Sequence, residues 1–138
     1  MKKLALAAAL VAAFAAPAFA DEHGDAAAGE KVFNVCKACH LIGDASGKKI
    51  GPSLNGLFGR TAGTLEGFEY SDAMKAKGAE GVVWTPEVLA EYIVKPKDYV
   101  PGTKMAYAGL KDEKKIADLV AFLLTHSPDY APTESESK

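Results

Sequence analysis

The chain has 138 residues, 49% of them hydrophobic, and 16 Lys and Arg against 18 Asp and Glu give a formal net charge of −2. This length suits one domain with one modest core, and the weakly acidic balance excludes the strongly basic character of a nucleic-acid binder. Beyond the first twenty residues no apolar run is long enough to span a bilayer, so we expect a soluble mature protein.

The first twenty residues are typical of an export signal. A lysine pair starts the segment, an unbroken apolar run covers Leu4–Phe14, and Ala18–Ala20 is a small-x-small cleavage site. The alternative is an uncleaved membrane anchor, since the apolar run approaches the lower end of the about 17–25 residues that span a bilayer. Pro17 counts against the anchor. We predict a signal peptide at residues 1–20 that is cleaved after Ala20, and a periplasmic mature protein.

Helices are predicted near both ends of the mature chain. The first begins after Asp25 as N-cap and runs toward Cys36. The last begins after Asp112-Glu113 and shows the i, i+3, i+4, i+7 apolar pattern of an amphipathic helix. Its apolar positions are Ile116, Leu119, Val120 and Leu123.

Two further helices are predicted in the middle of the chain. Thr85, followed by a proline at the first helical position, begins a helix that Pro96 ends. Ser71 caps a shorter predicted helix that runs through Lys77 and ends at Gly78.

Residues 41–70 show neither helical nor strand periodicity and are rich in glycine. A structureless loop of this length is uncommon inside a compact domain, unless it wraps a large apolar ligand that completes the core. After Ser127 the chain is rich in proline, glutamate and serine. We therefore predict one domain at residues 21–126 and a flexible tail at residues 127–138.

Cys36-Lys37-Ala38-Cys39-His40 is the C-x-x-C-H signature of covalent haem attachment. Cysteines three residues apart lie on one face of a helical turn, where each sulfur can form a thioether with one vinyl group of the haem. His40 follows directly and can place an imidazole nitrogen on the iron. The motif predicts one covalent haem c bound by Cys36 and Cys39, with His40 as an iron ligand.

Three other interpretations of the cysteines are weaker. A Cys36–Cys39 disulfide would close a very small loop and constrain the unfolded chain little. A thioredoxin-like redox pair is expected in a βαβ setting, which this helix-rich sequence lacks. A zinc site needs further Cys or His ligands at recognisable spacing, and His23 and His126 are too isolated.

One axial position of the iron remains, and after signal removal Met74 and Met105 can offer a thioether. Met105 follows Pro101-Gly102, which favour an irregular loop able to aim a side chain inward. Met74 lies in a predicted helix and is interpreted as core. Histidine is the competing ligand type, but His126 at the end of the last helix is interpreted as a surface residue. We favour Met105, because His/Met ligation is associated with electron-carrying haem proteins.

The motifs together make the chain resemble the class I c-type cytochromes, the soluble bacterial relatives of mitochondrial cytochrome c. The resemblance implies an all-α fold of about four to five short helices, with long loops wrapped around one haem. Three features depart from the family pattern: Met74 often corresponds to a polar residue, Tyr107 often corresponds to phenylalanine, and a few residues are inserted before Trp84. The matching stretches are Gly51-Pro52-Ser53-Leu54, Gly56-Leu57-Phe58-Gly59-Arg60, Phe68-Glu69-Tyr70-Ser71-Asp72, Trp84 and Pro101-Gly102-Thr103-Lys104-Met105.

The resemblance also implies roles for individual residues. The Pro52 carbonyl accepts a hydrogen bond from the second nitrogen of the ligating histidine. Hydroxyls near the methionine sulfur come from Tyr92 and Thr103, and Gly29 with Phe33 meets the last helix at Leu119 and Phe122. Donors to the haem propionates are Arg60, Tyr70 and Trp84.

With both axial positions filled by protein, the expected activity is transfer of one electron and not enzymatic catalysis. Two alternative functions are a thiol–disulfide enzyme and a haem sensor or peroxidase-like protein whose sixth ligand leaves. By resemblance, a monomer would take electrons from a membrane cytochrome bc complex and deliver them to a terminal oxidase or a photosynthetic reaction centre. A ring of lysines around the haem edge is also implied, consisting of Lys31, Lys37, Lys49, Lys97, Lys104 and Lys111.

Overall fold

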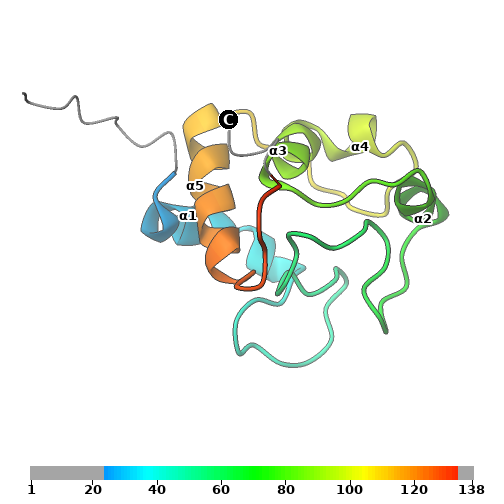
Figure 1. Ribbon diagram of the computed structural model, residues 1–138, viewed down its shortest axis with the longest axis horizontal. Coiled ribbons are helices and arrows are strands. Elements are labelled where there is room, and N and C mark those ends of the chain that lie inside the picture. The colour runs from blue at the N-terminus through cyan, green and yellow to red at the C-terminus, as the bar shows by residue number, and fades with distance from the viewer. Residues whose placement is uncertain (1–23, 134–138) are drawn as a thin grey trace, which may run out of the picture.

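A computed structural model describes residues 24–133 and contains only helices and loops over that range (Figure 1). The predicted signal peptide lies outside the described residues, as do residues 134–138. The five α-helices confirm the predicted all-α fold, and the one sheet-like feature within the described range is an isolated bridge between Thr61 and Val83. None of the helices there is long and apolar enough to cross a membrane. Their bounds are Ala26–Phe33 (α1), Asp72–Ala79 (α2), Pro86–Val94 (α3), Pro96–Tyr99 (α4) and Glu113–Thr125 (α5), with a 3₁₀ turn at Cys36–Ala38.

Helices α1 and α5 lie side by side although they come from opposite ends of the chain (Figure 1). The ring of Phe33 is fully buried and its centroid lies 5.3 Å from that of Phe122. Gly29 makes the close crossing possible, because a Cβ atom at this position would collide with the backbone of Asp118 and lie 2.8 Å from the Cβ of Phe122. The contact of Gly29 and Phe33 with the last helix is thus confirmed.

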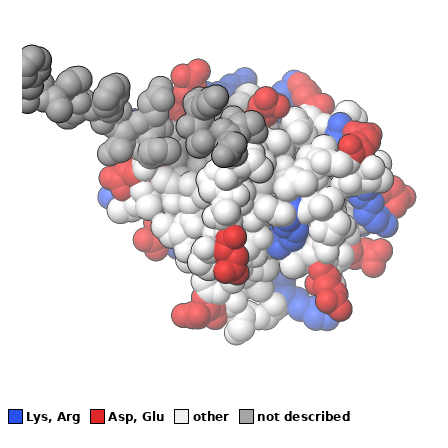
Figure 2. Space-filling model, viewed as in Figure 1, with Lys and Arg blue, Asp and Glu red and all other residues white. Residues whose placement is uncertain are grey.

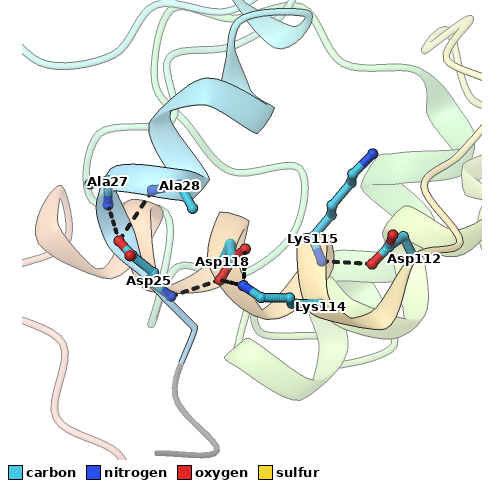
Figure 3. Close-up of polar contacts among 7 residues, drawn as sticks. All are labelled: Asp25, Ala27, Ala28, Asp112, Lys114, Lys115 and Asp118. Atoms are coloured by element: carbon cyan, nitrogen blue, oxygen red, sulfur yellow. Dashed lines mark hydrogen bonds and ion pairs between the residues drawn. The ribbon is translucent and has the colours of Figure 1, made fainter.

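A polar network closes the same crossing (Figure 3). The buried carboxylate of Asp118 accepts hydrogen bonds from the backbone N–H of Asp25 at 2.7 Å and from Lys114 Nζ at 2.9 Å. These bonds, led by the one from Lys114, hold the pKa of Asp118 below its usual range. Asp25 in turn caps α1, its side chain accepting from the Ala27 and Ala28 N–H groups. Sequence reasoning missed Asp118, because only the packing shows that this charged residue is buried.

The middle helices begin where the sequence predicted and differ at their ends. Ser71 and Thr85 cap α2 and α3 through the N–H groups three residues on. Helix α2 continues through Gly78 to Ala79, one residue beyond the predicted end. The glycine does not end the helix but allows close packing, because a Cβ atom there would collide with the carbonyl of Ala62. Pro96 ends α3 as predicted and also starts the short helix α4.

Residues 41–70 contain no helix and are held instead by hydrogen bonds across the segment and to residues outside it. Leu54 N donates to the Leu41 carbonyl at 3.0 Å, and Ala62 N donates to Val82 at 2.8 Å. The Asn55 amide pairs with both backbone groups of Gly43, each at 2.8 Å. The long loop is therefore fixed in place by contacts that depend on tertiary structure.

The predicted flexible tail from residue 127 is corrected by the structure over its described part. Ser127 is 4% exposed, and its Oγ accepts a hydrogen bond from Phe58 N at 3.2 Å. The Tyr130 ring packs on Phe58 with centroids 5.6 Å apart. Packing therefore continues beyond the predicted boundary at residue 126, because Ser127 and Tyr130 find partners in a loop that is remote in sequence.

Charged side chains of both signs are scattered over the face seen in Figure 2, with uncharged surface between them. This distribution agrees with the small net charge of the chain. Any electrostatic steering must therefore depend on a local group of charges.

We expect Gly29→Ala to destabilise the fold by about 3 kcal/mol or more, the upper end of the cost of overpacking a core. The added methyl group meets backbone atoms of α5, which cannot rotate away. Urea unfolding measures the change. Ala27→Ser, an addition on the exposed side of α1, is the control and should cost less than about 0.5 kcal/mol. Equal losses for the two variants would contradict the role of Gly29 in the crossing.

Candidate functional site

The C-x-x-C-H motif forms a tight turn directly after α1. The N–H groups of Cys39 and His40 both donate to the Cys36 carbonyl, at 3.0 and 2.9 Å. Both cysteines are half-buried thiols that form no disulfide. Burial raises the pKa of Cys36, and the neighbouring Cys39 raises it further. The turn gathers two thiols and an imidazole within one short segment.

The His40 ring is oriented by the Pro52 carbonyl, which lies 2.7 Å from Nδ1. A carbonyl oxygen can only accept a hydrogen bond, so Nδ1 carries the proton and Nε2 presents a lone pair. Burial lowers the pKa of His40 more than the bond to Pro52 raises it. The ring is therefore neutral near pH 7, the state in which histidine ligates a metal.

Gly51 leaves room for this arrangement and was not assigned a role from the sequence. A Cβ atom at this position would lie 2.6 Å from His40 Cε1 and 2.9 Å from the Cys39 carbonyl. Gly51 N also donates to that carbonyl at 2.8 Å. The Gly51-Pro52 pair was visible as a motif, but its closeness to the imidazole required the tertiary structure.

Met105 lies in the irregular segment that the sequence predicted for it, next to Tyr92 and Thr103. The Tyr92 hydroxyl donates to Met105 Sδ at 3.0 Å, and Met105 N donates to Thr103 Oγ1 at 3.1 Å. Burial raises the pKa of Tyr92 to about 12, although a hydrogen bond with Thr103 opposes the shift. Tyr92 therefore keeps its proton and remains a donor to sulfur. Met74, by contrast, is buried in the core at the start of α2.

Arg60, Tyr70 and Trp84 occupy neighbouring parts of the structure. Arg60 is half-buried and its guanidinium donates to the carbonyls of Ser53 at 3.1 Å and Asn55 at 3.4 Å. Burial lowers the pKa of Arg60, and the nearby Tyr70 raises it. Trp84 N donates to the Arg60 carbonyl at 2.9 Å. The expected propionate donors thus lie together, with the Arg60 guanidinium tied to its own loop.

Trp84 connects this group to the methionine. Its buried ring meets that of Tyr92 edge-on, with centroids 5.1 Å apart, and Tyr92 contacts the Met105 sulfur. His126 serves the fold: its half-buried ring packs on Phe122 at 4.9 Å, and its carbonyl accepts from Gly56 N at 2.7 Å. It is therefore less exposed than the surface position interpreted from the sequence.

The donor set fits a covalent haem better than an isolated metal ion. Within residues 24–133, no group of three or more His, Cys, Asp or Glu is placed to hold a metal. Two free thiols on one turn, a neutral imidazole and a thioether sulfur are present instead. Imidazole and thioether suit iron and are poor ligands for Mg²⁺ or Ca²⁺. The residues present can thus bond a porphyrin through sulfur and ligate its iron.

Comparison with known proteins agrees with this chemistry. The family model described as Cytochrome c matches residues 26–127. The chain is 51% identical over 129 residues to cytochrome c2 of Blastochloris viridis, covering 94% of this chain and 97% of that protein. Its identity to cytochrome c-550 of Ancylobacter novellus is 48% over 103 residues, 75% of this chain and 96% of the relative.

Solved structures show the same relationship. Cytochrome c2 from Rhodospirillum Centenum aligns with a TM-score of 0.72 and 38% sequence identity, over 76% of this chain and all of that chain (100%). Cytochrome cH from Methylobacterium extorquens aligns with a TM-score of 0.67 and 44% identity, covering 74% and 99% of the two chains. The chain therefore belongs to the cytochrome c family of electron carriers, and its cofactor is one covalent haem c.

Proposed function

We propose that this protein is a periplasmic one-electron carrier in which Cys36 and Cys39 bind the haem and His40 and Met105 are the iron ligands. The hydrogen bond between His40 Nδ1 and the Pro52 carbonyl carries the proposal. It leaves Nε2 as the free ring nitrogen of the residue that directly follows Cys39. When bound, the haem iron supplies exchange of one electron between two oxidation states.

The two cysteines provide attachment that survives outside the cell. Cys36 and Cys39 would hold the haem through one thioether each, and addition of a thiol across a vinyl group needs no oxidant. The 3₁₀ turn brings the two sulfurs to the same segment and places His40 directly after them. Attachment and ligation are therefore set by one local backbone conformation.

Tyr92 tunes the proposed methionine ligand. Its hydroxyl donates to Met105 Sδ at 3.0 Å, which withdraws electron density from the sulfur and leaves another lone pair for a metal. Thr103 holds the backbone N–H of Met105. A weakly donating, rigidly held thioether disfavours the more positive oxidised iron and raises the reduction potential. The held geometry also keeps reorganisation on electron transfer small.

The haem propionates are proposed to contact Arg60, Tyr70 and Trp84. A carboxylate in a low-dielectric site is costly unless charge-assisted hydrogen bonds satisfy it. Arg60 is positively charged and half-buried, and Tyr70 and Trp84 lie beside it. With His40 and Met105 both as ligands, the iron would offer no position for a substrate, which supports a carrier and not an enzyme.

The proposed localisation and partners are based on the family resemblance and on the predicted signal peptide at residues 1–20. We propose cleavage after Ala20, which would release a monomeric domain to the periplasm. A cytochrome bc complex would be the donor, and a terminal oxidase or a photosynthetic reaction centre the acceptor. The relatives named cytochrome c2 support this role by their similarity to the chain.

Covalent haem attachment is tested by intact mass of the exported protein. We expect the mass to exceed that of the chain from Asp21 by one haem, and the coloured band to survive acid-acetone extraction. Cys36→Ala with Cys39→Ala should lose both properties, because no sulfur remains to bond the vinyl carbons. A mass equal to the bare chain from Asp21 would refute the proposal.

Met105 is tested against Met74. Met105→Ala should remove the weak red-edge sulfur-to-iron band of the oxidised protein and lower the potential, since the sixth ligand is lost. Met74→Leu preserves apolar volume at a buried core position and should cost less than about 1.5 kcal/mol of stability, with band and potential retained. Visible spectra and redox titration measure both. The reverse pattern would show that the ligand assignment is wrong.

Docking through the lysine ring is tested by charge reversal. Lys104 is exposed directly before Met105, so Lys104→Glu should slow second-order electron transfer to an acidic membrane partner. The effect should shrink as salt shortens the screening length, about 10 Å at 0.1 M. Lys97→Glu should act similarly.

The control for these variants is Lys115→Glu, on the exposed side of α5. Lys77 would be a poor control, because its ammonium pairs with Glu80 at 3.4 Å and lies 5.6 Å from the centre of the Tyr99 ring, so its loss would also remove these contacts. Rates should be compared at fixed salt between variants of equal potential. Equal slowing at all three positions, or rates indifferent to salt, would rule out steering by this ring.

A further inference from the structure

We propose that Ser127 and Tyr130 are positioning residues that hold Arg60 in its place and thereby help to set the reduction potential. They belong to residues 127–130, here called the C-terminal strap, which follows α5. Their target is residues 53–60, here called the Arg60 loop. The inference rests on the proposed function, because it takes Arg60 as the cation that faces a haem propionate.

The strap contacts the Arg60 loop through backbone and side chain. The carbonyl of His126, directly before the strap, accepts from Gly56 N at 2.7 Å. Ser127 Oγ accepts from Phe58 N at 3.2 Å, and this contact is buried. Successive turns of the loop are thus bonded to the segment that leaves α5.

Tyr130 covers the loop from outside. Its ring packs on Phe58, which is 4% exposed, with centroids 5.6 Å apart. A Cβ atom on Gly59 would lie 3.5 Å from Tyr130 Cδ2. The ring therefore lies over the two residues that directly precede Arg60.

The same loop is also held by Trp84. Gly59 N donates to the Trp84 carbonyl at 2.8 Å, and Trp84 N donates to the Arg60 carbonyl at 2.9 Å. The Arg60 guanidinium donates to the Ser53 and Asn55 carbonyls inside the loop. The backbone around Arg60 is consequently attached both to Trp84 and to the strap, so release of the strap removes one of these two attachments.

Loss of the contacts between the strap and the Arg60 loop is expected to lower the reduction potential. A positive charge near the haem disfavours the more positive oxidised iron, so a displaced or better hydrated Arg60 lowers the potential. The Phe58 N–H is buried, and removing the Ser127 hydroxyl leaves it without that acceptor. Both changes act on the loop and leave the proposed iron ligands untouched.

The experiment measures the midpoint potential of the haem-loaded protein in four variants. Tyr130→Ala and Ser127→Ala should each lower the ratio of reduced to oxidised protein at fixed ambient potential by at least about twofold, the lower end of coupling within one contact network. Tyr130→Phe keeps the ring that packs on Phe58 and should retain more of the potential than Tyr130→Ala. Asp129→Ala, at an exposed strap position, is the matched control and should also retain it.

Combining Tyr130→Ala with Arg60→Gln tests whether Tyr130 affects the potential through Arg60 or only through the stability of the fold. If Tyr130 acts through Arg60, then Tyr130→Ala should lower the potential of the parent protein and cause no further loss in Arg60→Gln. A structural role alone would lower the unfolding midpoint and leave the potential unchanged. Ser127→Ala, which removes one hydroxyl, serves if the Tyr130→Ala variant fails to fold.

Three outcomes would overturn the inference: an equal loss of potential in both backgrounds, no loss in either, or no effect of Arg60→Gln itself. Each is distinguishable from failure of the proposed function, because the haem mass increment and reversible one-electron reduction would persist. Hydrogen exchange at Phe58 N gives an independent check. Its protection should fall in Ser127→Ala and remain in Asp129→Ala.

Discussion

The close crossing of α1 and α5 positions both sides of the site. Gly29 allows the two backbones to approach, and the buried Asp118 bonds the start of α1 to α5. The turn that carries the cysteines follows α1 directly, while the segment that covers Phe58 follows α5 directly. Displacement of either helix would therefore move an element of the haem environment. A contact between the first and the last of the described helices thus helps to determine the geometry of the site.

Each proposed iron ligand is held at an atom that does not bind the metal. Pro52 holds His40 through Nδ1, and Thr103 holds Met105 through its backbone N–H. Such outer contacts fix ligand orientation and electron donation. Tyr92 acts on the sulfur itself, and burial keeps its hydroxyl protonated. The arrangement is suited to a metal whose ligands stay in place during electron exchange.

The long loop between the C-x-x-C-H turn and α2 is ordered without regular structure. Its backbone groups bond to residues near the turn, before α3 and after α5. This satisfies buried polar groups that a helix would pair internally. The loop can thus bring Pro52 and Arg60 to separate parts of the site, which a single rigid helix could not do. Phe58 anchors it in the core.

Features that depend on neighbours along the chain could be predicted from the amino-acid sequence. The motif at Cys36–His40, the caps at Ser71 and Thr85 and the stop at Pro96 are local, because each is set by residues within about four positions. The family resemblance further pointed to Pro52, Tyr92 and Thr103, and the structure places these beside the expected partners.

Features that depend on distant partners became visible when the folded chain brought those partners together. Asp118 becomes a buried hydrogen-bond acceptor because α1 delivers an N–H to it. Gly78 was predicted to end a helix, but it lies inside α2, where the absence of a side chain leaves room for the Ala62 carbonyl. Ser127 and Tyr130 look like part of a polar tail until Phe58 packs against them. Composition and periodicity report a residue's own preference, whereas burial also depends on which remote atoms the fold brings within contact distance.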